Sequence, residues 1–267
     1  MLSHSPRTHI LACLTFLGCI ATAHADTFVY PGASPCNTTL QGCINAAPAD
    51  SVIRIATNAL IAENVTITRS LIIEPAIGFT ASLWGIQTLA QEREVDVHIR
   101  GLSITRSGLS AMRGYGGQNL TFRATNNRVD STTGSAISSV DYIPASSDAN
   151  VSFTLVGNVI THRSTAGSCT DAILLQGFTA NLYARISNND IYMPLAPDCA
   201  AIAVAVAVDH DGAVIIDRNR VVGDQLNQGI RATHDGTASA SALGGTLTAQ
   251  ITNNIVTGQA LLGDDAG

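Results

Sequence analysis

Apolar and polar residues alternate along several segments of the chain, and each of these segments leads into an asparagine. Before Asn127 the apolar positions are Leu120, Phe122 and Ala124, and the segments before Asn158 and Asn189 follow the same scheme. Alternation with a period of two is typical of a β-strand with one buried face. A Val or Ile two positions after each asparagine returns the chain to the apolar side. The pattern predicts a strand, a turn at the asparagine, and a return to the buried face.

Five such asparagines, which we call the ladder asparagines, recur at a nearly constant distance. Successive members are 31, 31, 30 and 35 residues apart, and they are Asn127, Asn158, Asn189, Asn219 and Asn254. A period in this range indicates that one supersecondary unit is stacked repeatedly. Because adjacent strands lie about 4.7–4.9 Å apart, equivalent asparagines would lie one above another and their amides could bond as a ladder. Asparagine also tolerates left-handed backbone, which suits a tight turn.

A second strand is predicted in each coil, 10 to 15 residues after the asparagine. Its start is an Ala-Ile or Gly-Ile pair within residues 135–137, 171–173, 200–202 and 228–230. Earlier strands are predicted at residues 52–55, 65–68, 71–73 and 95–104, which brings the total to about seven coils. Turns that vary in length on a constant stack are where such a fold usually carries its function.

The repeat resembles that of the right-handed parallel β-helix, the fold of pectate lyases and of many secreted proteins. The resemblance implies an all-β protein in which a single-stranded β-helix forms one domain over residues 26–267. It implies little about function, because one scaffold hosts many activities.

The first 25 residues have the composition of a secretion signal. Arg7 supplies positive charge, residues 10–21 form an apolar run too short to span a bilayer, and residues 23–25 match the small-x-small cleavage pattern. We therefore expect a secreted, periplasmic or cell-surface protein that begins at Asp26. A lipoprotein anchored at Cys19 is the alternative, although Phe16 fits that signal poorly.

A short helix is predicted to close the first coil. Residues 37–39 provide capping side chains, and Leu40, Cys43, Ile44 and Ala47 follow with helical spacing. An open stack exposes its interior and its strand edges, and a helix with one polar face can cover both.

Four cysteines remain after removal of the signal, and export favours disulfides. Cys36 and Cys43 flank a short segment near the start of the chain, while Cys169 and Cys199 are one coil apart. We expect these two pairings. A metal site is the alternative, but it would require histidines beside the cysteines, and none is there.

Every basic residue of the chain is an arginine, and the net charge is −6. This balance argues against nucleic acid or an anionic membrane as a partner, and it excludes a lysine base. No phosphate loop, nucleophile elbow or metal motif occurs, so we expect no cofactor.

One candidate binding site lies on the predicted outer face. Arg123 and Arg185 stand at equivalent positions two coils apart, and Tyr183 shares the outward side with Arg185. An aromatic ring with two arginines could hold an acidic sugar. The alternative is a solvated face on which Asp190 pairs with Arg220 on the next coil.

A second candidate is a pair of His-Asp-Gly sequences that contain His210, Asp211, His234 and Asp235. The first copy resembles the Asp-Pro-His-Asp signature of alginate epimerases, which are also β-helices, although the proline is missing here. The resemblance implies general acid and base roles for His and Asp. His-Asp-Gly is also ordinary turn composition, so a structural role is the alternative.

Two functions therefore remain open. The first is a non-catalytic extracellular protein that binds polysaccharide through its outer face. The second is a polysaccharide-modifying enzyme, either a uronate lyase or an alginate-type C5-epimerase. The sequence does not indicate an oligomeric state.

Overall fold

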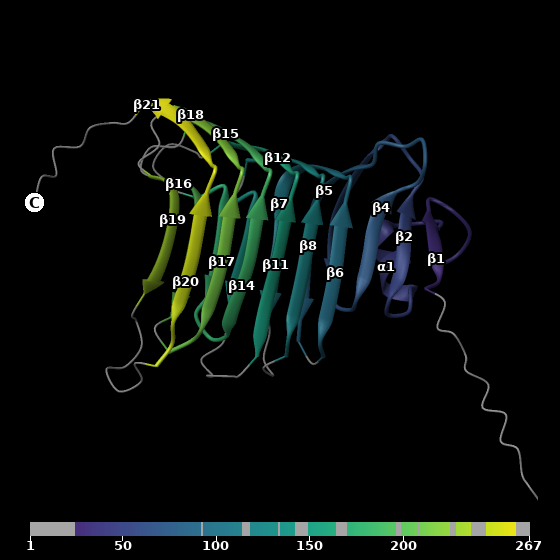
Figure 1. The fold of residues 1–267 in the computed structure, drawn as a ribbon. Coiled ribbons are helices and arrows are strands. Elements are labelled where there is room, and N and C mark those ends of the chain that lie inside the picture. The colour runs from purple at the N-terminus through teal and green to yellow at the C-terminus, as the bar shows by residue number, and fades with distance from the viewer. Residues whose placement is uncertain are drawn as a thin grey trace, which may run out of the picture.

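The computed structural model describes residues 25–91, 93–113, 118–132, 134–141, 149–163, 170–195, 199–207, 209–224, 228–235 and 244–259. Within these residues the chain forms strands in parallel sheets and one short helix (Figure 1). The predicted parallel β-helix is confirmed. Residues 1–24 of the predicted signal lie outside the described residues, so the signal stays a prediction.

Sheet A is the nine-stranded sheet that faces the viewer in Figure 1. Each of its strands comes from one coil, so it has two more rungs than the expected seven or so, and the first of them is β1. In spatial order the strands are β1 (Thr27–Tyr30), β2 (Ser51–Ile55), β4 (Leu71–Pro75), β6 (Val95–Arg100), β8 (Leu120–Thr125), β11 (Asn150–Val156), β14 (Asn181–Ser187), β17 (Gly212–Asp217) and β20 (Leu247–Thr252).

Sheet B forms the rest of the wall. The first coils contribute long strands, namely β3 (Leu60–Ile67), β5 (Ser82–Ala90) and β7 (Ser103–Arg113). The later coils contribute two shorter strands each. The strands that follow the asparagine turns are β9 (Arg128–Ser131), β12 (Val159–Arg163), β15 (Asp190–Leu195), β18 (Arg220–Asp224) and β21 (Ile255–Gln259). The predicted second strands are β10 (Ile137–Asp141), β13 (Ile173–Gly177), β16 (Ala200–Ala207) and β19 (Gln228–Asp235).

Strand β7 joins the two halves of sheet B. Its start pairs with β9 and its end, Leu109–Arg113, pairs with β10. Between them Gly108 has φ +73, and a Cβ there would lie 2.5 Å from the carbonyl oxygen of Ala136. Glycine is required at this bend because other residues would clash. The bend turns a two-walled coil into the three-walled coil of the later repeats.

The apolar residues of the alternating pattern point into the interior of the stack. Leu120, Phe122 and Ala124 are buried, and in register with them lie the buried Val151, Phe153 and Leu155 on the next rung. The rings of Phe122 and Phe153 pack in a tilted arrangement with centroids 6.0 Å apart. The inward positions of β10, β13, β16 and β19 are aligned in the same way, isoleucine above isoleucine.

The ladder asparagines form the predicted ladder. Nδ2 of Asn158 donates to Oδ1 of Asn189 at 2.9 Å and to the carbonyl oxygen of Ala124 at 2.8 Å. Oδ1 of Asn158 accepts from both the backbone N–H and Nδ2 of Asn127. The same contacts recur up to Asn254. The buried amides therefore use all of their hydrogen-bonding capacity, which burial requires.

The left-handed residue of each turn is not the ladder asparagine but the residue before it. Positive φ values occur at Asn126, Gly157, Asn188, Arg218 and Asn253. The two residues have different roles in the turn. The ladder asparagine holds its side chain in the interior, so the preceding residue makes the chain reversal. Asn and Gly suit that conformation, whereas Arg218 does not.

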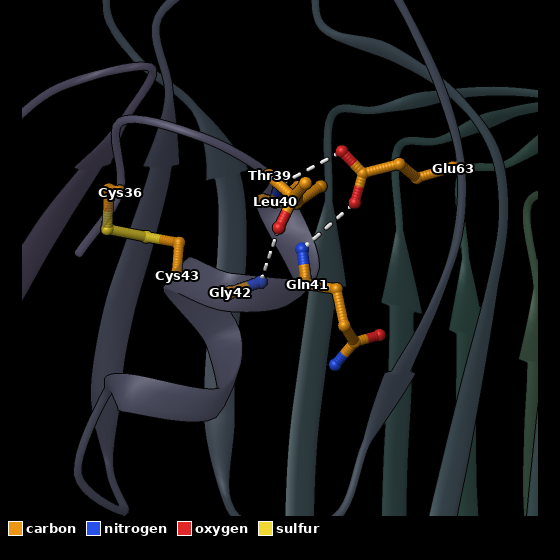
Figure 2. The surroundings of a disulfide bond; sticks show 7 residues. All are labelled: Cys36, Thr39, Leu40, Gln41, Gly42, Cys43 and Glu63. Carbon is orange, nitrogen blue, oxygen red and sulfur yellow. Dashed lines mark hydrogen bonds between the residues drawn. A yellow bond between two sulfur atoms is a disulfide. The ribbon is translucent and has the colours of Figure 1, made fainter. Parts of the chain in front are cut away.

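Helix α1 (Leu40–Ala46) closes the N-terminal end as predicted. Thr39 caps it by accepting from the N–H of Gly42 (Figure 2). The predicted apolar stripe of Leu40, Cys43, Ile44 and Ala47 is buried. The disulfide between Cys36 and Cys43 is confirmed. Cys199 is also disulfide-bonded, but Cys169 lies outside the described residues, so its pairing stays a prediction.

Two side chains fix this helix to β3. The Glu63 carboxylate accepts the N–H groups of Leu40 and Gln41 at 3.0 Å each (Figure 2). The Gln41 amide in turn accepts from the N–H of Thr66 at 2.7 Å and donates to its carbonyl oxygen at 2.9 Å. Gln41 thus makes the two hydrogen bonds that a neighbouring strand would make, and it covers the edge of sheet B.

Candidate functional site

The outer face of sheet A carries the side chains that the sequence singled out for binding. Arg123, Thr154, Arg185 and Ile215 form one column of register partners. A second column contains Thr121, Ser152, Tyr183 and Ala213 in the same order. Arg123 and Arg185 therefore lie two rungs apart, about 10 Å, as expected.

Arg123 forms an ion pair with another residue of the outer face of sheet A. Its Nη2 lies 3.0 Å from Oδ2 of Asp96, and both side chains are about half exposed. In register with Arg123 on the preceding rung is His98, whose Nε2 lies 2.8 Å from the Thr125 hydroxyl. Asp96, His98 and Arg123 thus form a polar cluster across two rungs.

This cluster borders a hollow of about 140 Å³ on the outer face. Its described lining consists of Asp50, Leu71, Ile72, Asp96, His98 and Arg123. Burial lowers the pKa of His98, and the nearby guanidinium groups of Arg100 and Arg123 lower it further, against the opposing effect of Asp96 and Glu74. A neutral imidazole therefore faces this hollow near pH 7.

Next to the cluster, Glu74 binds two arginines. Its carboxylate accepts from Arg54 at 3.1 Å and from Arg100 at 2.6 Å. Partial burial acts to raise the pKa of Glu74, but the hydrogen bonds and charges of the two arginines outweigh it and lower the pKa. The triad spans three rungs and fixes the charge pattern at the N-terminal half of the face.

Tyr183 and Arg185 lie further along the same face, on β14. Tyr183 is 41% exposed and Arg185 is also exposed. Within the described residues Arg185 forms no ion pair or hydrogen bond through its side chain, in contrast to Arg123. Of the two arginines of the predicted site, Arg123 is therefore paired with a carboxylate, whereas Arg185 has no such partner among the described residues.

A cleft of about 480 Å³ adjoins the turns that lead into β4 and β6. Its described lining is Thr68, Arg69, Gln91 and Arg93. Arg69 donates to the carbonyl oxygen of Ala47, which holds it in place. The cleft is polar and positively charged on the described side.

The predicted ion pair between Asp190 and Arg220 is present on sheet B. Nη1 of Arg220 lies 3.0 Å from Oδ1 of Asp190 on the preceding coil, and both are exposed. Such exposed pairs contribute at most about 1 kcal/mol. This pair lies on another wall from Arg185, so it does not neutralise the candidate site.

The His-Asp-Gly residues meet at the C-terminal end of the stack. The carbonyl oxygen of Ala207 accepts from the backbone N–H of His210 at 3.1 Å and from Nε2 of His234 at 3.0 Å. His210 is buried, with Nε2 at 3.7 Å from Oδ1 of Asp209. His234 is in register with the buried Val206 and so takes an inward position. The side chain of Asp235 lies outside the described residues.

Asp211 has a structural role that the sequence reasoning missed. Its Oδ1 accepts from the N–H of Thr246 at 2.9 Å and from the Thr246 hydroxyl at 3.0 Å. Asn181 accepts the N–H of Asp211 in the same way on the preceding coil, and Asn119 accepts that of Asn150. Asp211 therefore takes the asparagine position in a second, outer row of turn residues.

The two hydrogen bonds from Thr246 favour the ionised form of the Asp211 carboxyl group. The N–H and hydroxyl of Thr246 lower the pKa of its carboxyl group, and the charges of His210 and His234 add to the effect. Asp211 follows His210 in the chain, and His234 bonds the carbonyl oxygen that also accepts the backbone N–H of His210, so the three residues lie at one corner. A carboxylate with a lowered pKa is a weak proton acceptor, which does not suit a general base.

The sequence contained a signal for the Asp96 cluster that we did not use. In the segment VDVHIR the outward positions are Asp96, His98 and Arg100, three ionisable groups in one strand. Their partners Glu74 and Arg123 lie on neighbouring rungs, and only the register brings them together.

In the part of the chain that the structure describes, no three His, Cys, Asp or Glu side chains are grouped for a metal ion. None of the described helical segments is long and apolar enough to cross a membrane. Comparisons with protein-family models, with curated proteins and with solved structures find no match.

Proposed function

We propose that this protein is an exported, non-catalytic β-helix that binds an acidic polysaccharide along the outer face of sheet A. The observation that carries the proposal is the juxtaposition of Tyr183 and Arg185. Both project from the same face of β14, both are exposed, and Arg185 is unpaired within the described residues.

The two side chains suit the two chemical parts of a uronate residue. A sugar ring has an apolar C–H face that stacks on an aromatic ring such as that of Tyr183. Its carboxylate can accept two parallel hydrogen bonds from the guanidinium group of Arg185. An unpaired arginine gives up only water when it binds such a group.

The surface beside Tyr183 and Arg185 offers polar groups to several successive sugar residues, which favours a polysaccharide over a single sugar as the ligand. Ser152 and Thr154 lie on the preceding rung and offer hydroxyl groups to sugar hydroxyls. Beyond them lie Arg123 and the hollow lined by Asp96 and His98. The rung spacing of about 4.8 Å repeats these groups along a straight line. The cleft lined by Arg69 and Arg93 adds two further arginines at the turns that lead into β4 and β6.

Calorimetric titration with uronate oligosaccharides, and with neutral oligosaccharides of the same length, tests the proposal. We expect binding of the acidic series, and we expect Arg185→Gln to weaken it about tenfold or more, since hydrogen bonds to charged groups contribute roughly 1.5–3 kcal/mol. Tyr183→Ala should weaken it as well. Arg220→Gln removes the same charge from another wall and is the matched control. Equal losses in Arg185→Gln and Arg220→Gln, or no binding of any acidic oligosaccharide, would refute the proposal.

One observation favours the second function, a polysaccharide-modifying enzyme. His210, Asp211 and His234 converge at one corner, although each side chain has a separate set of contacts. Assays for unsaturated uronate release and for C5 inversion, repeated with His210→Ala, test this function. Turnover that His210→Ala abolishes would support it, and turnover that survives the change would remove His210 from the mechanism.

A further inference from the structure

The two ends of the stack differ in how they are finished. At the N-terminal end α1 packs on β3, and Gln41 occupies the hydrogen-bonding groups of Thr66. At the C-terminal end three strands, β19, β20 and β21, each pair with a neighbour on one side only. We call these three strands the terminal rung. It stands at the yellow end of the ribbon in Figure 1.

The terminal rung exposes side chains that belong to the interior. Ile251 is in register with Ile216 and Val256 is in register with Val221. Ile216 and Val221 are fully buried, whereas Ile251 and Val256 are each 47% exposed. The difference arises because each buried residue has a rung on both sides and each exposed one has a rung on one side only.

The asparagine ladder also stops incomplete at this rung. Asn254 accepts from Asn219 and donates to the carbonyl oxygen of Ile216 at 2.8 Å. Every earlier ladder asparagine donates its backbone N–H and a second Nδ2 hydrogen to the next asparagine. Among the described residues no acceptor meets these two donors of Asn254.

The terminal rung is uncharged in its last two strands. Residues 247–259, with the sequence LTAQITNNIVTGQ, contain no Asp, Glu or Arg. Exposed edge strands in monomers usually carry charges that prevent pairing with another chain. Like charges placed opposite each other oppose pairing, so an uncharged edge can meet its own copy in a chain of net charge −6.

We propose that the terminal rung is the interface of a two-fold symmetric dimer, in which the same rung of a second copy covers it. A two-fold axis that crosses the middle of β20 places β20 antiparallel beside its own copy and sets β19 of one copy beside β21 of the other, so the same rung of both copies forms the interface. Helix α1 hinders head-to-tail stacking on sheet B, because it covers the edge of β3 that a terminal rung would need, whereas the outer edge of β1 in sheet A has no strand partner among the described residues. Strands β19, β20 and β21 contain 8, 6 and 5 residues. This is close to the about 20–30 residues a side of a stable interface.

The dimer completes what the terminal rung lacks. Ile251 and Val256 gain a covering layer from the second copy, and the edges of the three strands gain hydrogen-bond partners. Burial of these apolar side chains is the main driving force.

Light scattering after size exclusion, on the full chain over a wide range of concentration, tests the proposal. We expect twice the monomer mass. Ile251→Lys places a charge in the interface at a site already half exposed in the monomer, and it should halve the mass while the circular dichroism spectrum is unchanged. The matched control is Ile215→Lys on the outer face of sheet A, where the isoleucine is 41% exposed, and it should remain a dimer.

Four results with the full chain and its two variants would overturn the proposal. These are a monomeric full chain, an Ile251→Lys variant that still dimerises, an Ile215→Lys variant that dissociates equally, or assemblies larger than a dimer. If only a chain ending at Gln259 dimerises, the segment 260–267 occupies the rung in place of a second copy, and the proposal also fails. Hydrogen exchange gives an independent readout, because the amides of β20 should be better protected in the full chain than in Ile251→Lys.

Discussion

Nδ2 of Asn158 and Oδ1 of Asn189 lie 2.9 Å apart in the interior of the stack, 31 residues apart in the sequence. The contact joins two consecutive coils through side chains alone. It belongs to a continuous row that runs from Asn127 to Asn254 and fixes the register of every coil between them.

Removal of a central ladder amide should be strongly destabilising. Asn158→Ala leaves the carbonyl oxygen of Ala124 and the N–H of Asn127 buried without partners, at about 1–3 kcal/mol each. We expect the free energy of unfolding to fall by roughly 3 kcal/mol or more in urea titrations. Asn254→Ala is the control at the half-buried end of the ladder, and its loss should be smaller. Equal losses would contradict the ladder as a source of stability.

Arg218 should be replaceable with a gain in stability. Its φ of +55 is left-handed, a conformation that costs a side chain about 1–2 kcal/mol and that glycine adopts freely. We expect Arg218→Gly to raise the free energy of unfolding by up to about 1 kcal/mol in thermal or urea unfolding. Arg220→Gly, in the neighbouring strand, should lower it, because glycine weakens a strand. A loss in both variants would show that the ion pair of Arg218 with Asp217 outweighs the backbone strain.

The buried His162 should make the fold sensitive to acid. Its Nε2 donates to the carbonyl oxygen of Thr170 at 2.8 Å, and among the described residues the buried Nδ1 has no hydrogen-bond partner. Burial lowers the pKa of His162 below its ordinary value of 6.5, despite the opposing effects of Thr170 and Asp171. The unfolded chain therefore binds the proton more readily than the folded one. Stability is full above about pH 6.5 and falls as the pH decreases below it.

Measurement of unfolding free energies between pH 8 and pH 5 checks this prediction. His162→Gln should be less stable at pH 8 but should lose less stability on acidification than the unmodified chain. His98→Gln is the control for the other histidine with a lowered pKa, which lies on the outer face. An unchanged pH dependence in His162→Gln would contradict the assignment.

Asp211 should be exchangeable for asparagine but not for alanine. Asn can accept the N–H of Thr246 as Asn181 accepts that of Asp211, whereas Ala cannot. The Asp211 pKa is lowered in the folded state, so its stabilising effect is present at neutral pH and is lost as the pH falls through the acidic range. We therefore expect Asp211→Asn to melt near the original temperature at pH 7 and to lose part of the acid dependence. Asp211→Ala should have a lower melting temperature. Equal melting temperatures of Asp211→Asn and Asp211→Ala would refute the structural role.

Several features of the fold were predictable because they are periodic. The ladder from Asn127 to Asn254, the buried strand residues and the repeated isoleucines all follow from one spacing in the sequence. Since a stack places equivalent residues in register, the column of Arg123 and Arg185 followed as well. The capping helix was predictable because its signals, Thr39 and the apolar stripe, are local.

By itself, the sequence determined the stack, its register and the side on which each strand residue lies, because these depend on period and alternation. Only the tertiary structure decided which residues meet across coils of different length. It joined Asp96 to Arg123, Gln41 to Thr66, and His210 with His234 to one carbonyl oxygen. These contacts depend on the number of residues in each turn, which leaves no repeating pattern in the chain.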